Sequence, residues 1–109
     1  MRFNITARHF KLSEELKAFT QEEASRLAKY YDGILDIEVI LGWEKKDRTA
    51  EIKIAVYGTV LTAKESSEDM HVSVRVAVDK MERQLIKYKD KLRGFEHEKA
   101  AAPDAGAGG

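Results

Sequence analysis

The residues best suited to chemistry gather in one segment, DKMERQLIKYKDKL, which runs from Asp79 to Leu92 and holds five cations in fourteen residues. The whole chain is balanced, with 19 basic and 19 acidic residues. Between Lys80 and Arg93 six cations accompany only two anions, so positive charge is concentrated here and the rest of the chain is net negative. Closely spaced lysines and arginines contact phosphates or acidic surfaces. The segment is therefore a candidate anion-binding surface.

Helical phase sorts these cations onto one side of a helix. At about 100° per residue, four cations fall within an arc of roughly 80°, with Gln84 at its edge and no anion inside it. The four are Lys80, Arg83, Lys87 and Lys91. The acidic residues Asp79, Glu82 and Asp90 are expected across the helix, where neighbouring cations screen them.

The separation of basic from acidic residues around the helix favours a binding surface over an accidental arrangement. Like charges one turn apart repel by a few tenths of a kcal/mol per pair, so a purely solvated helix gains from alternating signs. A row of cations one turn apart suits a nucleic-acid backbone, and Gln84 can add hydrogen bonds to bases or ribose. The alternatives are an ordinary solvated helix face, because Lys and Arg are good helix formers, and a face that docks an acidic protein partner.

The first helix offers a smaller basic supplement. Arg26 and Lys29 lie on the side away from Leu16 and Leu27, and are expected as secondary contacts. Glu15 and Glu22 share that side and partly neutralise it, so this prediction depends on the last helix being a contact surface.

No residue pattern predicts catalysis. The chain has no cysteine, which excludes a disulfide framework and a thiolate nucleophile. His9, His71 and His97 lack ligand spacing, and there is no glycine-rich phosphate loop or nucleophile elbow. We expect no enzymatic activity, metal, cofactor or small-molecule substrate. The chain also lacks an apolar run of roughly 20 residues for a membrane span and the apolar centre of a signal peptide, so we expect a cytoplasmic protein.

Hydrophobic periodicity predicts the order β-α-β-β-β-α. Strands follow from period-two alternation and helices from apolar spacings of three and four. Ser13 is expected to cap the first helix, Ser66 and Ser67 the second. The valines of Val72 to Val78 alternate as in a strand, but the longer apolar stripe from Met70 to Leu92 favours a helix. The predicted strands are 2–8, 34–43, 49–57 and 60–65, and the predicted helices run from 13 to 31 and from about 68 to 93.

These elements predict an α+β fold with a four-stranded mixed sheet and two helices packed on one face. A crossover helix makes the first two strands parallel neighbours, and two hairpins add the others antiparallel. The second strand is expected to point Leu35, Ile37, Val39, Leu41 and Trp43 toward the core, with Trp43 as a core residue rather than a base-stacking one. The face predicted to meet water carries Asn4, Thr6, Glu38, Ile40, Glu51, Lys53, Tyr57, Thr62 and Lys64.

The chain is long enough for one domain, predicted to span residues 1–95. Residues 96–109 are rich in Ala and Gly and hold the single proline, which is typical of a flexible tail.

Taken together, these segments resemble the ribosome hibernation promoting factor and ribosome-associated inhibitor A family. The last helix carries Glu68-Asp69-Met70, Asp79-Lys80-Met81 and Arg83-Gln84-Leu85, followed by Lys87 and Lys89, in a pattern similar to that of the family. The ITARHF opening, the ARLAKYYDGILDIEVIL segment and LGWEKK extend the resemblance over about residues 1–95. His71, where the family commonly has an aromatic residue, and Met81, where it has leucine, depart from the pattern without touching the basic row.

The resemblance implies a stress or stationary-phase factor that binds the small ribosomal subunit. It would lie in the messenger RNA and tRNA channel, contact ribosomal RNA through both helices and block translation. The RNA-binding residues so implied are Lys80, Arg83, Gln84, Lys87 and Lys91, with Arg26 and Lys29 as secondary contacts. The free protein is expected to be a monomer. The ribosome-pairing domain of long family members has no counterpart after Phe95, so the chain is expected to be a short form or a fragment.

Overall fold

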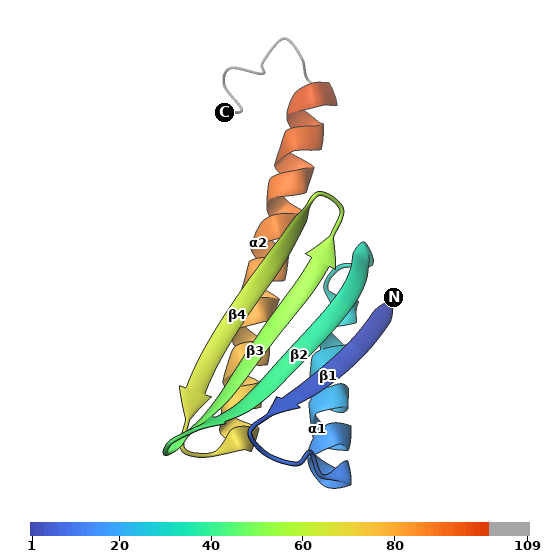
Figure 1. The fold of residues 1–109 in the computed structure, drawn as a ribbon. Coiled ribbons are helices and arrows are strands. Elements are labelled where there is room, and N and C mark those ends of the chain that lie inside the picture. The colour runs from blue at the N-terminus through green and yellow to red at the C-terminus, as the bar shows by residue number, and fades with distance from the viewer. Residues whose placement is uncertain (101–109) are drawn as a thin grey trace.

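The chain folds in the predicted order, β-α-β-β-β-α, in a computed structural model that describes residues 1–100, with side chains described as far as Leu92 (Figure 1). A 3₁₀ turn, η1, extends the first helix. The elements are β1 (Arg2–Arg8), α1 (Glu14–Ser25), η1 (Arg26–Lys29), β2 (Ile34–Glu44), β3 (Asp47–Val56), β4 (Thr59–Ser67) and α2 (Met70–Ala100).

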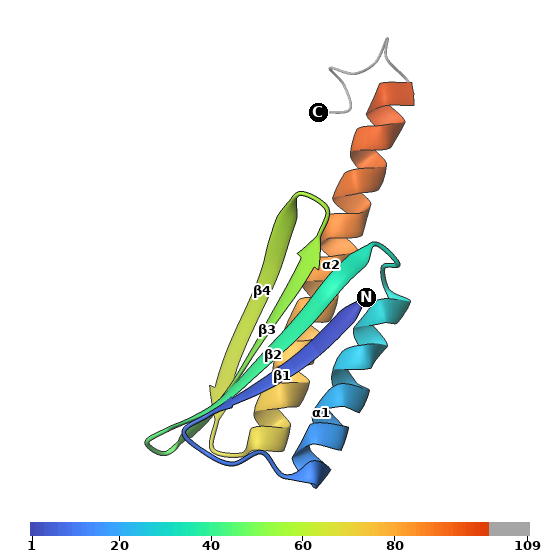
Figure 2. The ribbon, with the colours of Figure 1, turned by 45° about the vertical axis from the view of Figure 1, so that its right-hand side comes forward.

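The predicted mixed sheet is confirmed, with strand order β1-β2-β3-β4. β1 is parallel to β2, and the two following pairs are antiparallel. Both helices lie on one face of the sheet, with α2 running beneath β3 and β4 and α1 on the β1 side (Figure 2). β1 and β4 are therefore the two edges, and no element among residues 1–100 covers the opposite face of the sheet.

The core lies between the sheet and the two helices. α2 contributes the predicted stripe, in which Met70, Val74, Ala77, Val78, Met81 and Leu85 are all buried. The facing side chains come from the middle strands and α1. They include Ile37, Val39 and Leu41 of β2, Ala50, Ile52, Ile54 and Val56 of β3, Ala63 of β4, and Leu16, Ala24 and Leu27. The continuous buried stripe explains why the alternating valines form a helix rather than a strand.

The start of β2 differs from the predicted alternation. The register shifts between Ile34 and Asp36, so Ile34 is buried and Leu35 is 53% exposed. A bulge inserts one residue into a strand and reverses the facing of the residues before it. The prediction that Leu35 points inward is therefore wrong, whereas Ile37, Val39 and Leu41 are buried as predicted.

Trp43 is not a core residue, contrary to prediction. It is 44% exposed at the end of β2, beyond the helices that cover Leu41. Its ring stacks on Phe10, with centroids 5.1 Å apart, and the Arg48 guanidinium carbon lies 4.2 Å from its centroid. Phe10 and Arg48 of the same molecule thus contact the indole ring.

The uncovered sheet face carries the polar residues predicted for it. Two cross-strand rows define it, one of Asn4, Glu38, Lys53 and Thr62 and one of Thr6, Ile40, Glu51 and Lys64. Ile40 is nevertheless buried, because longer side chains surround it. Tyr57 lies in the β3–β4 turn instead of on this face and is almost fully exposed.

The ends of the helices differ from the prediction in three ways. α1 ends at Ser25 and gives way to η1, so the regular helix does not reach Tyr31. Ser66 and Ser67 belong to β4, where they pair with Thr49 and Arg48, and cannot cap α2. α2 continues past Gly94 to Ala100, because one glycine costs a helix only about 1 kcal/mol. The predicted tail otherwise lies outside the described residues, and Ser13 caps α1 as predicted.

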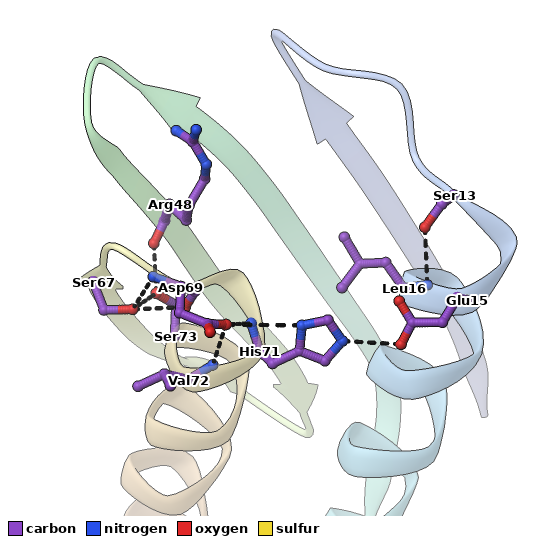
Figure 3. A network of polar contacts seen from close by, with 9 residues as sticks. All are labelled: Ser13, Glu15, Leu16, Arg48, Ser67, Asp69, His71, Val72 and Ser73. Carbon is purple, nitrogen blue, oxygen red and sulfur yellow. Dashed lines mark hydrogen bonds and ion pairs between the residues drawn. The ribbon is translucent and has the colours of Figure 1, made fainter.

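Asp69 is the residue that caps α2. Its Oδ1 accepts hydrogen bonds from the backbone N–H groups of His71, at 2.8 Å, and Val72, at 3.4 Å (Figure 3). These are the second and third residues of the helix, whose N–H groups have no partner within it. The carboxylate also places negative charge at the positive end of the helix dipole.

Ser73 fixes this first turn to the sheet. Its fully buried hydroxyl donates to the carbonyl oxygen of Arg48 at 2.5 Å and lies 2.6 Å from the Ser67 hydroxyl (Figure 3). On the other side of α2, His71 Nε2 lies 2.9 Å from the Glu15 carboxylate of α1, and the His71 ring packs on Phe19. Both the position of α2 along the sheet and its spacing from α1 are thereby set.

We predict that Ser73→Ala lowers the free energy of unfolding by about 1–3 kcal/mol, because the partly buried Arg48 carbonyl loses the hydrogen bond that the fully buried Ser73 hydroxyl donates. Urea unfolding followed by circular dichroism measures this change. Ser66→Ala is the matched control, since Ser66 is exposed and has no side-chain hydrogen bond to the described residues. Equal stability of the two variants would contradict the role given to Ser73.

An ion pair joins the start of β1 to β2. Arg2 Nε donates to Asp36 Oδ1 at 2.9 Å. This hydrogen bond, more than the charge of Arg2, holds the pKa of the Asp36 carboxyl below its ordinary value. Because the pKa is lower in the folded state, the pair contributes stability above the unfolded pKa and loses it as pH falls through the folded one.

We therefore expect Asp36→Asn to be less stable than the unaltered chain at neutral pH, and the difference to disappear as pH falls below about 4. Thermal unfolding of both proteins across this pH range measures the difference. If the difference in stability between the two proteins stays constant down to acid pH, the ion pair is not its cause.

Candidate nucleic-acid interface on the second helix

The apolar stripe of α2 determines which way its cations point. Because Val74, Ala77, Val78, Met81 and Leu85 are buried, the helix cannot rotate about its axis. One flank then lies toward the β4 edge and the other toward α1 and η1 (Figure 2). We call Lys80, Arg83, Gln84, Lys87 and Lys91 the basic flank; contacts of its members with β4 show that it is the flank on the β4 side.

Lys80 is held by an anion that the helical phase does not reveal. Its Nζ lies 3.2 Å from Oε2 of Glu65 on β4. Both side chains are partly exposed, so the pair is worth at most about 1 kcal/mol. Lys80 is therefore positioned by the sheet, and part of its charge is already balanced.

Gln84 is also attached to the edge strand. Its Nε2 donates to the backbone carbonyl oxygen of Thr62 at 2.7 Å. The second N–H and the side-chain carbonyl have no partner among the described residues and remain available. By contrast, Arg83, Lys87 and Lys91 form no ion pair with the side chains described through Leu92.

Two shallow hollows adjoin at Gln84 and Lys87, which line both. The larger, of about 420 Å³, is also lined by Lys80, Arg83, Ile86 and Asp90. The smaller, of about 210 Å³, is lined by Leu61, Gln84, Lys87, Tyr88 and Lys91. Together they form a shallow groove along α2, and the smaller hollow reaches β4 through Leu61.

Asp90 corrects the predicted distribution of charge. It lines the larger hollow beside Arg83 and Lys87 instead of lying across the helix. Seven residues make almost two full helical turns, which returns Asp90 to within about 20° of Arg83. The smaller hollow has no carboxylate among its lining residues, whereas Asp90 offsets one of the three cations that line the larger hollow.

Arg26 and Lys29 do not join the basic flank. They lie on η1, which packs near the opposite flank of α2. Arg26 Nη1 is 3.3 Å from a carboxylate oxygen of Glu23. Next to them, a hydrogen bond to Glu82 of α2, followed by burial, raises the pKa of the Tyr30 hydroxyl. The two predicted basic groups are thus separated by the width of α2.

Sequence reasoning missed Glu65, Leu61 and Tyr88 as parts of this surface. The strand pattern in the sequence could have indicated Glu65, because this residue occupies an inward position in the same strand as Leu61 and Ala63. A carboxylate on the core side of a strand requires a cation or a hydrogen-bond donor. Tyr88 was assigned to the apolar stripe, and no local pattern places it beside Leu61.

Metal-binding groups and membrane-spanning helices were also sought among the described residues. Within that part of the chain, no group of three or more His, Asp or Glu side chains gathers to hold a metal ion. None of the helices there combines the length and apolar character that a bilayer crossing requires.

Comparison with known proteins identifies the family. The model of the Sigma 54 modulation protein / S30EA ribosomal protein family matches residues 3–93. The chain belongs to this family. The S30EA match spans β1 through the basic flank, and the resemblance noted in the sequence is confirmed.

Named relatives agree with the S30EA assignment. A ribosome hibernation promoting factor of Escherichia coli K12 is 33% identical over 93 residues, covering 85% of this chain and 98% of the relative. One from Azotobacter vinelandii is 33% identical over 91 residues, covering 84% and 85%. Among solved structures, a ribosomal subunit interface protein from Coxiella burnetii matches with a TM-score of 0.77 and 27% identity, covering 83% of this chain and 99% of that one.

We predict that Glu65→Gln strengthens binding to polyanions, because it releases the Lys80 ammonium from its partner. The variant should elute from a heparin column at higher salt than Glu51→Gln, which makes the same change of net charge on the uncovered sheet face. Co-elution of the two variants would show that the local position of Lys80 does not matter.

Proposed function

We propose that this protein binds the small ribosomal subunit through the basic flank and silences translation by occupying the messenger RNA and tRNA channel. The relatives named as ribosome hibernation promoting factors support a ribosomal partner. The observation that carries the proposal is a set of cations, Arg83, Lys87 and Lys91, that form no ion pair with the described side chains and lie beside a groove on a helix that the core holds in place. A cytoplasmic location follows from the proposed partner.

The proposed mechanism is steric and electrostatic. Rigid packing holds α2 in one orientation, so binding to a phosphate backbone requires no ordering of the helix itself. Each phosphate neutralised releases condensed counterions, which favours binding at low salt. Occlusion of the channel then requires no chemical step, and the proposal assigns no catalytic residue. Arg26 and Lys29 would make a separate, secondary contact on the η1 side.

The first test reverses two charges that form no ion pair with a described carboxylate. Arg83→Glu with Lys87→Glu should abolish co-sedimentation with the small ribosomal subunit, because two attractive phosphate contacts become repulsive. Lys80 is left unchanged, since a glutamate there would face Glu65 and disturb the fold. Sedimentation in sucrose gradients at low salt, with circular dichroism to verify folding, measures the effect.

Lys45→Glu with Lys46→Glu is the matched control. It makes the same change of net charge in the exposed β2–β3 turn and should retain binding. Loss of binding in both double variants would show that binding depends on the net charge of the protein and not on the position of these residues. Unchanged binding of the Arg83 and Lys87 variant would refute the assignment of the basic flank.

Salt and ribonuclease separate this proposal from docking of an acidic protein. If three phosphates are neutralised by Arg83, Lys87 and Lys91, the logarithm of affinity should fall with the logarithm of salt with a slope of about −2 to −3. A pull-down treated with ribonuclease should lose its main partner. A partner that survives complete RNA digestion would favour the acidic-protein alternative.

A further inference from the structure

The smaller hollow of the groove combines features that a phosphate-binding row alone does not need. Leu61 and Tyr88 give it an apolar and aromatic wall, Gln84 gives it hydrogen-bonding groups, and Lys87 and Lys91 stand at its border. Phosphate contact explains only the two lysines. The remaining three side chains are suited to a flat, apolar group with polar edges, which is the chemistry of a nucleobase.

Two of these side chains are already fixed in orientation. Tyr88 donates its hydroxyl hydrogen to the Tyr57 carbonyl oxygen at 3.4 Å, and its ring makes an edge-to-face contact with Tyr31, with centroids 5.6 Å apart. Gln84 is fixed by its hydrogen bond to Thr62. Because the Thr62 carbonyl can only accept, the amide nitrogen must be the atom that faces it.

That orientation leaves Gln84 with one N–H donor and a carbonyl acceptor beside the hollow. A donor and an acceptor on the same amide can bond to two neighbouring positions on the edge of a base. Neither group has to be freed from another partner among the described residues first. The interaction is therefore prepared before the ligand arrives, which reduces the cost of binding.

Charge distinguishes the two hollows as well. Asp90 lines the larger hollow among Lys80, Arg83 and Lys87, whereas the smaller hollow is bordered by Lys87 and Lys91 and has no lining carboxylate. Its volume of about 210 Å³ is below the roughly 300–1,000 Å³ of pockets that enclose a drug-sized ligand. One base with its flanking phosphates fits these limits better than a larger ligand does.

We propose that the hollow between α2 and β4 is a subsite for a single unpaired RNA nucleotide, with the base against Leu61 and Tyr88 and its edge read by Gln84. Lys87 and Lys91 contact the adjoining phosphates. This inference rests on the proposed function but adds to it: the protein would recognise an unstacked base, beyond attraction to any polyanion.

The experiment compares three labelled RNA oligomers by fluorescence anisotropy with the full chain at low salt. They are an eight-nucleotide single strand, the same strand with abasic ribose at its central positions, and a duplex of the same sequence. The abasic strand keeps its phosphates and loses its bases. The intact single strand should bind about tenfold more tightly than either of the others, in the range expected for loss of base stacking.

Two variants separate base recognition from phosphate contact. Gln84→Met keeps the side-chain length and should reduce the advantage of intact over abasic RNA severalfold while leaving the salt slope unchanged. Lys87→Met should weaken all three oligomers alike and reduce the salt slope by about one. Gln21→Met, on the exposed part of α1, is the control and should change neither quantity.

Each contrary outcome has a definite meaning. Equal affinity for intact and abasic strands, no detectable binding of any oligomer, or equal behaviour of Gln84→Met and Gln21→Met would overturn the subsite. Competition by heparin as effective as that by single-stranded RNA would assign the groove to polyanions in general. Because co-sedimentation with ribosomal subunits is measured separately, the subsite can fail while the proposed function stands.

Discussion

The burial of one apolar stripe on α2 is the constraint on which the rest of the structure depends. Val74, Ala77, Val78, Met81 and Leu85 pack against β3 and β4 and leave the helix a single orientation about its axis. Burial of each of the larger of these side chains contributes about 1.5–3 kcal/mol, far more than any single surface ion pair. Charges on α2 therefore take the positions that the core assigns them. The basic flank exists because the opposite side of the helix is apolar.

Burial of the apolar stripe fixes the orientation of α2 about its axis but not the residue at which the helix begins. Polar contacts fix that residue. Asp69 caps α2, and Ser73 bonds to the Arg48 carbonyl, so the first turn is fixed to the end of β3. These contacts fix the position of α2 along its own axis, in addition to the orientation that the apolar stripe imposes. A shift of one turn moves every cation by about 5.4 Å. The positions of Gln84 against Thr62 and of Lys80 against Glu65 thus depend on hydrogen bonds made seven or more residues away, at Asp69 and Ser73.

The order of the elements, the strand pairing and the buried side of α2 followed from the sequence, because each reflects a local period extended over many residues. Features that depend on contacts between elements did not. The bulge at Leu35 interrupts the alternation without a glycine or proline to mark it, and the two serines with good capping propensity are used by β4 pairing instead. Helical phase identified the four cations of the candidate site. It could not find Glu65, which is fifteen residues from Lys80 and becomes its neighbour only when α2 packs beneath the edge strand.

The members of the basic flank consequently divide into two kinds. Lys80 and Gln84 are attached to β4 and give up part of their binding capacity to the fold, whereas Arg83, Lys87 and Lys91 keep their full charge without a described partner. A long side chain that is already ordered loses little entropy on binding, while a free one loses up to about 2 kcal/mol but can adapt its position. Selectivity is expected from the ordered residues and strength from the free cations. Gln84 is the ordered residue with unused hydrogen-bonding groups, so discrimination between ligands should depend on it more than on any lysine.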